Sequence, residues 1–202
     1  MKDHIKVSDE RVEITKRLLI QRDLVGLFVL GLIIPANAIA TGMLPSTIIG
    51  IVVGGSRLMD LFAGAFEKVP YKSSVMLPVF MNVLIVAVCL LAPENPVIFA
   101  GFITLFGAVA GLMATNSNET IKLIISVNST QLSNRNFKSK RTTFRAIGSL
   151  SGIGCTVLIL KFIGDENWRI IYYVMGIMNI VYVIFNLRLY RSIKDLEDQI
   201  KY

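Results

Sequence analysis

Six apolar runs of similar length constrain the fold of this chain more than any other feature; four of the five breaks between them are short, and the fourth spans residues 116–145. A helix needs roughly 20 apolar residues to cross the hydrocarbon core of a membrane. The runs occupy residues 24–41, 46–66, 74–92, 97–115, 146–163 and 169–189. Several of the breaks contain turn-forming residues, such as Gly42 and Pro45 after the first run. The sequence therefore predicts an all-α, polytopic membrane protein with six transmembrane helices.

Composition agrees with a membrane location. Of the 202 residues, 53% are hydrophobic and only 17% are charged, and the mean hydropathy is +0.62. An ordinary soluble domain carries roughly 25% charged residues. Cys89 and Cys155 lie inside apolar runs, and His4 has no cysteine or histidine near it. We therefore expect no metal, no cofactor and no enzymatic activity, because a membrane enzyme needs clustered His, Asp, Glu or Ser side chains at one depth.

Basic residues fall almost entirely on one side of the predicted membrane. If the chain starts in the cytoplasm, 19 of the 21 lysines and arginines lie on that side, and only Lys161 and Arg169 lie opposite. The positive-inside rule then places both termini in the cytoplasm, with the protein in the inner or plasma membrane. Topology and anionic lipid explain the formal net charge of +7, so we expect the lipid bilayer, and no nucleic acid, as a partner.

The predicted organisation has three parts. They are a cytoplasmic amphipathic leader (1–23), a six-span transmembrane domain (24–190) and a cytoplasmic tail (191–202). The leader mixes apolar and charged residues, which fits either a helix on the membrane surface or a solvated tail. Residues 121–141 begin apolar and become basic, so we expect them to continue the fourth helix out of the bilayer before the chain turns back at Thr142.

The polar residues of the second run share one face of a helix. Gly50, Gly54, Arg57, Asp60 and Gly64 are separated by 4, 3, 3 and 4 residues. A charge at the centre of a membrane helix costs roughly 2.5–3.5 kcal/mol, so these two charges need an explanation. Two interpretations stand: Arg57 and Asp60 pair with each other or across a helix contact, or Arg57 reaches the headgroups with Asp60 beside it.

Small residues four positions apart recur in three of the runs. Such spacing lets two helices approach closely, although it does not say whether the contact lies within one chain or between chains. The pairs are Gly50 and Gly54, Gly107 and Gly111, and Gly148 and Gly152.

Four polar side chains at or near membrane depth are candidates for lining a cavity. Pro35 and Pro78 interrupt helical hydrogen bonding in the first and third runs, and a kinked helix beside a polar group is one way to build a central cavity. An interhelical hydrogen bond explains each asparagine equally well, and the glutamate fits cytoplasmic water equally well. The candidates are Asn37, Asn82, Asn116 and Glu119.

The connection after the second run resembles a motif of the major facilitator superfamily of transporters. The family's turn reads approximately Gly-x-Leu-Ala-Asp-Arg-x-Gly-Arg-Lys. Glu67 takes the place of the acid, Lys68 that of the base after it, and Lys72 that of the last base. The sequence departs from the motif at Ala63 and Pro70, which replace its two glycines, and at Tyr71, which replaces a base.

Two further stretches carry the resemblance. Arg57-Leu-Met-Asp60 is similar to the Arg-x-x-Asp of sugar-cation symporter-like members, and the basic connection ending in Arg141 and Arg145 also fits the family. Together the likeness covers most of residues 22–190. It implies a major-facilitator-like half bundle of six helices, since members of the family normally join two such halves in one polypeptide.

The resemblance also implies roles for particular residues. They are gating for Glu67, Lys68 and Lys72, a cytoplasmic charge network for Arg57, Asp60, Arg141 and Arg145, and packing between halves for Gly50, Gly54, Gly148 and Gly152.

These expectations combine into a functional hypothesis. The chain is a half-transporter that pairs, as a homodimer or with a separate second six-helix half, to move a small molecule or peptide by gradient-driven alternating access. No Gly-x-x-x-x-Gly-Lys-Ser/Thr phosphate loop is present that would point to nucleotide-driven transport. The alternative is a non-transporting immunity, scaffold or regulatory subunit with the fold of a transporter half.

Overall fold

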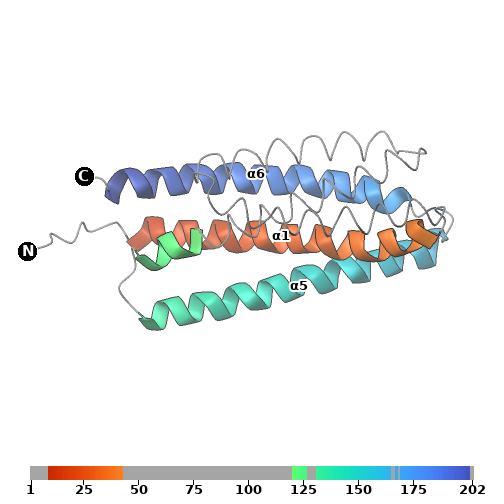
Figure 1. Cartoon of the computed structure of the whole chain (residues 1–202), viewed down its shortest axis with the longest axis horizontal. Coiled ribbons are helices and arrows are strands. Elements are labelled where there is room, and N and C mark those ends of the chain that lie inside the picture. Colours follow the sequence, from red (N-terminus) through yellow and green to blue (C-terminus); the bar gives the residue numbers. More distant parts are fainter. Residues whose placement is uncertain (1–8, 43–119, 127–130, 165–166, 168, 201–202) are drawn as a thin grey trace, which may run out of the picture.

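A computed structural model describes residues 9–42, 120–126, 131–164, 167 and 169–200 of the chain. This part is all-helical, which confirms the predicted all-α class. It consists of α1 (Asp9–Gly42), a short helix at residues 120–126, α5 (Gln131–Ile163) and α6 (Arg169–Ile200) (Figure 1). The predicted spans at 46–66, 74–92 and 97–115 lie outside the described residues.

The helix α1 lies between α5 and α6. It packs along both of them, whereas α5 and α6 hardly touch each other. Figure 1 shows α1 and α5 running in the same direction and α6 returning in the opposite one. The start of α1 and the end of α6 therefore lie at the same end of the bundle (Figure 1).

All three helices are longer than a membrane requires. They contain 34, 33 and 32 residues, and at 1.5 Å per residue each measures about 50 Å, against a hydrocarbon core of about 30 Å. Asp9 and Glu10 stand in the first turn of α1, where the helix dipole favours carboxylates. The helix then continues through Pro35 to Gly42.

The helix boundaries differ from those expected from the sequence. α1 crosses the expected limit between leader and first span without a break, and α6 likewise continues into the tail. α5 is already helical from Gln131, so the chain does not turn back at Thr142. The short helix at 120–126 ends before residues 127–130, which lie outside the described part.

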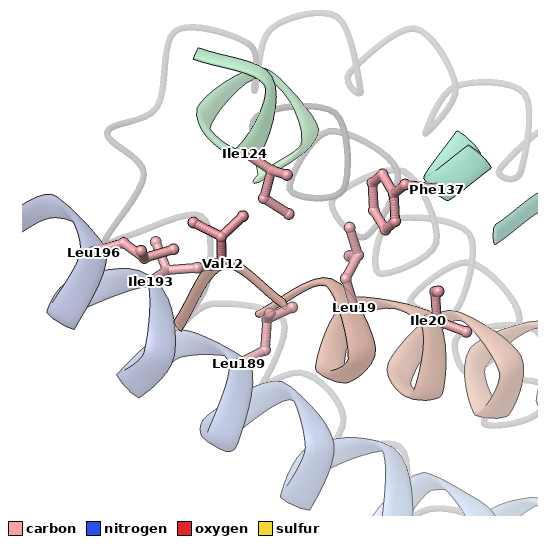
Figure 2. Close-up of a cluster of buried hydrophobic side chains, with 8 residues drawn as sticks. All are labelled: Val12, Leu19, Ile20, Ile124, Phe137, Leu189, Ile193 and Leu196. Carbon is pink, nitrogen blue, oxygen red and sulfur yellow. The ribbon is translucent and has the colours of Figure 1, made fainter. Parts of the chain in front are cut away.

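A cluster of apolar side chains at one end of the bundle explains why the helices extend beyond the spans expected from the sequence. These side chains pack on one another across α1, the short helix, α5 and α6, as Figure 2 shows. The helical leader thus buries apolar side chains such as Val12 and Leu19 against protein, which removes them from water. The cluster consists of Val12, Leu19, Ile20, Ile124, Phe137, Leu189, Ile193 and Leu196. We call the helical segments around it, residues 9–23, 120–126, 131–145 and 188–200, the stalk.

Beyond the stalk, glycines bring α1 and α5 into close contact. A Cβ on Gly148 would collide with the carbonyl oxygen of Leu24, and one on Gly152 would collide with that of Phe28 and lie 2.9 Å from the Cα of Gly31. These positions therefore exclude any larger residue unless the backbone moves. One turn further, the hydroxyl of Thr156 lies 3.3 Å from the carbonyl oxygen of Leu32 and 3.2 Å from that of Gly152.

Two helical segments are long and apolar enough to cross a membrane, namely Asn134–Ile163 and Arg169–Leu196. Most residues in the most apolar stretch of the first segment are not buried inside the protein. Leu150 and Phe162 of α5 are 69% and 78% exposed, and Ile177 and Ile184 of α6 are exposed as well. Such large apolar faces call for a covering of lipid or of another protein.

Candidate functional site

A buried cluster of charged side chains joins the three long helices where the stalk ends. Arg22 and Asp23 come from α1, Arg141 from α5 and Asn186 from α6. The Asp23 carboxylate accepts hydrogen bonds from both guanidinium groups, at 2.9 Å from Nη2 of Arg22 and 2.5 Å from Nε of Arg141. Nη1 of Arg22 lies 3.5 Å from the amide oxygen of Asn186, which makes the link to α6 the longest of the three.

The cluster is shielded from solvent by the protein itself. Arg22 is 0% exposed and Asp23 is 5% exposed. Burial of this kind is costly for isolated ions and is tolerated when the charges are paired and hydrogen-bonded. One carboxylate between two guanidinium groups leaves the three ions with a net charge of +1.

The position of the cluster follows from the sequence of α1. Asp23 is the last charged residue before the apolar run that begins at Leu24. On the facing helix, Arg141 stands one turn before Arg145, the last base ahead of the apolar part of α5. The cluster therefore lies at the boundary between the stalk and the apolar part of the bundle.

The inward face of α6 continues from the cluster into the apolar part. Asn179, Tyr182 and Asn186 are separated by 3 and 4 residues, share one face and are all buried. Tyr182 lies close enough to Arg22 and Asp23 to experience their charges. Asn179 is 3% exposed, and its amide nitrogen has no hydrogen-bond partner among the residues that the structure describes. A buried amide donor of this kind costs stability unless something else binds it.

Further contacts connect the helices within the stalk. The hydroxyl groups of Thr15 and Ser192 lie 2.7 Å apart and join α1 to α6. The ammonium group of Lys16 lies 5.7 Å from the ring centre of Phe137, in cation–π contact with α5. These contacts join α1 to α6 and to α5 at a second place, within the stalk.

The structure brings together some of the site residues predicted from the sequence. Arg141 belongs to the buried cluster, whereas Arg145 is exposed on the same helix. Gly148 and Gly152 lie in the contact between α1 and α5. Asn37 lies on α1, but its side chain is not described. The remaining candidates lie outside the described residues; they are Gly50, Gly54, Arg57, Asp60, Glu67, Lys68, Lys72, Asn82, Asn116 and Glu119.

Sequence reasoning missed three members of the cluster. Arg22 and Asp23 counted as part of a leader, and Asn186 was not singled out. A signal was present, because an Arg-Asp pair directly adjoins an apolar run, where each charge needs a partner. The partner on α5 lies 118 residues away, so local spacing could not identify it.

The described part of the chain contains no group of three or more His, Cys, Asp and Glu side chains that could hold a metal ion. Comparison with protein families, with curated proteins and with solved structures finds nothing that matches this chain.

Proposed function

We propose that the chain is a membrane half-transporter of six transmembrane helices that works with a second six-helix half, supplied by another copy or by a separate chain. The buried cluster of Arg22, Asp23 and Arg141 is the observation that carries this proposal. Ionisable residues buried at the membrane boundary of a helical bundle are costly, and they commonly serve transport or its gating.

The cluster has a mechanical role in this proposal. Alternating access in two-bundle transporters is largely a rigid-body rocking of one bundle against the other. The glycine contact and the bond from Arg141 to Asp23 join α1 to α5, so both helices move as one unit. The movement then takes place between the two halves, where the proposal assigns gating to Glu67, Lys68 and Lys72.

The exposed apolar faces give the proposal further support. In a membrane they contact lipid or the second half, whereas in water they would promote aggregation. Both termini are cytoplasmic in this proposal, and the stalk is the cytoplasmic end of the half bundle.

The first test is the assembly state. Native mass spectrometry of the full chain, released from membranes in mild detergent, should detect a dimer or a complex with one other six-span chain. A stable monomer would contradict the half-transporter, because no second half would be present to complete the pathway.

The second test is solute-driven proton movement. Vesicles that contain the purified assembly and a pH-sensitive dye would be exposed to a panel of sugars, amino acids and short peptides. A solute that acidifies the lumen with the native chain, and fails to do so with Glu67→Gln, would support the proposed gate. Glu13→Gln is the matched control, since Glu13 lies in the stalk, is itself exposed and forms long ion pairs with Lys16 and Arg17, at 4.0 and 3.8 Å.

A non-transporting membrane subunit is the second candidate function, and one observation favours it. Both carboxylate oxygens of Asp23 are occupied by guanidinium groups of the same chain, which is what a purely structural cluster requires. Co-purification with an unrelated membrane protein, together with an unchanged phenotype in Glu67→Gln, would favour this role.

A further inference from the structure

One face of α6 is exposed and apolar over most of its length. Tyr173, Ile177, Ile180 and Ile184 are separated by 4, 3 and 4 residues, so they share one side of the helix. Their exposed fractions range from 36% to 58%. The side that carries Asn186 is buried and lies opposite. We call the four exposed residues the outer face of α6.

An arginine stands at each end of the outer face. Arg169 comes four residues before Tyr173 and Arg188 four residues after Ile184, so both arginines lie on the same side of the helix. Both are exposed, and residues 170–187 between them contain no charged side chain. At 1.5 Å per residue the two arginines are about 29 Å apart along the helix axis, close to the roughly 30 Å of a hydrocarbon core. The uncharged length of α6 therefore matches the thickness of a membrane.

The buried side of α6 marks one of these two boundaries independently. Arg188 is two residues from Asn186, whose amide oxygen lies 3.5 Å from Nη1 of Arg22 in the buried cluster. On α1 the apolar run begins directly after that cluster, at Leu24. Two neighbouring helices thus change from charged to apolar at the same level, which is what a single membrane surface requires.

The size of the side chains on the outer face indicates what covers it. Contacts between helices inside a membrane favour small residues, and the contact between α1 and α5 follows this rule with Gly31, Gly148 and Gly152. The outer face of α6 instead presents three isoleucines and a tyrosine. Tyr173 lies one turn inside Arg169, and tyrosine is enriched where a membrane meets water. Large side chains of this kind favour lipid over a second helix.

We infer that the outer face of α6 contacts the acyl chains of membrane lipid, with Arg169 and Arg188 at the two headgroup layers. The long arginine side chains reach headgroup phosphates from the ends of the apolar stretch. The inference rests on the membrane location in the proposed function and adds which surface the lipid covers. The second six-helix half then docks elsewhere on the bundle.

The test measures what surrounds spin labels on α6 in phosphatidylcholine vesicles. In the full chain with Cys89→Ala and Cys155→Ala, a single nitroxide-labelled cysteine replaces Ile177, Ile180 or Ile184. Electron paramagnetic resonance measures how often each label collides with oxygen, which concentrates in the membrane interior, and with nickel ethylenediaminediacetate, which stays in water. All three labels should collide with oxygen and lose their collisions with the nickel complex. The ratio of oxygen to nickel collisions should be highest at Ile177 and Ile180, which flank the midpoint between the two arginines.

Asp195→Cys is the matched control. Asp195 is exposed and follows Ile184 by 11 residues, or about three turns, so it lies on the same side of α6 but in the stalk. Its label should therefore collide freely with the nickel complex. Circular dichroism checks that each labelled variant keeps the helix content of the unlabelled chain.

Three results would overturn the inference, and they differ in what they leave of the proposed function. Nickel collisions at all three isoleucine positions would place α6 outside the membrane interior and would remove the half-transporter as well. Protection from both reagents would show that protein covers the outer face, and the half-transporter would stand. A ratio highest at Ile184 would mean that the arginines do not mark the two surfaces. Conversely, a monomer without transport whose labels meet oxygen alone would end the proposed function and keep the inference.

Discussion

At the scale of single residues, Asp23 is the residue on which the buried cluster depends. Among the residues that the structure describes, it is the carboxylate that contacts both Arg22 and Arg141. Without its negative charge, two guanidinium groups remain close together in a place with little access to water. Replacing an ion pair as a whole can be neutral, whereas removing one partner leaves an uncompensated buried charge.

Asp23→Asn should therefore destabilise the protein by about 3–5 kcal/mol. The amide keeps the size of the carboxylate and one acceptor oxygen, so the loss reports on charge rather than on packing. The free energy of unfolding can be measured by adding sodium dodecyl sulfate to the protein in mild detergent. Glu13→Gln, which removes an exposed acid on the same helix, should cost less than about 1 kcal/mol. Similar losses in the two variants would show that the cluster is not buried as described.

Asn179→Leu should stabilise the protein by about 1–2 kcal/mol. Its amide nitrogen is buried without a partner in the described structure, and leucine has the same number and branching of side-chain heavy atoms without a polar group to satisfy. Asn186→Leu is the matched control on the same face of α6. It removes the acceptor 3.5 Å from Arg22 and should cost about 1–3 kcal/mol. A loss of stability in Asn179→Leu, measured in the same detergent titration, would mean that a bound group or a second chain accepts its hydrogen bond.

At the scale of helices, the pair α1 and α5 is held by backbone contact. Three glycines and the hydrogen bond between Thr156 and the Leu32 carbonyl group bring the two backbones together. In a membrane, where lipid is as apolar as leucine, such close van der Waals packing is the main attraction between helices.

Gly152→Ala should separate α1 from α5 and destabilise the protein by about 1–3 kcal/mol. The added methyl group would collide with backbone atoms of Phe28 and Gly31, which cannot rotate away as a side chain could. Gly154→Ala is an internal control only two residues away, because a Cβ there meets nothing within 4 Å. That substitution should be neutral, or stabilising by up to about 1 kcal/mol through helix propensity. Proteolysis of the two variants in mild detergent would rank them, and equal resistance would argue against the close contact.

The helices also show how far the sequence could predict the fold. The apolar runs at 24–41, 146–163 and 169–189 correctly indicated helices. Strands are usually about 4–8 residues long, so an apolar run of about 18 residues or more favours a helix. Their polar extensions were not predicted, because residues such as Leu19, Phe137 and Ile193 show their burial only when four segments meet. For the same reason the role of Asp23 was not predicted, because its partner on α5, Arg141, is distant in sequence.

At the scale of the whole molecule, the stalk gives the protein two ends of different character. Charged side chains cover the stalk, and exposed apolar side chains cover the rest of α5 and α6. If α5 and α6 cross a membrane, helices of about 50 Å extend beyond a hydrocarbon core of about 30 Å at one end at least. The charges make the stalk that end.

Cysteine labelling should show the stalk on one side of the membrane and Lys161 on the other. In a Cys89→Ala/Cys155→Ala background, single cysteines replace Arg11, Lys138 and Lys194 in the stalk, or Lys161 near the far end of α5. All four positions are exposed, so burial cannot prevent the reaction.

A membrane-impermeant maleimide applied to sealed vesicles of known orientation then distinguishes two arrangements. If α5 and α6 cross the bilayer, the three stalk positions react together from one face and Lys161→Cys reacts only from the opposite face. If the bundle lies along the membrane surface or is surrounded by other proteins in water, all four positions react from the same face. That outcome would remove the membrane span on which the half-transporter depends, because a bundle that rocks within a membrane must cross it.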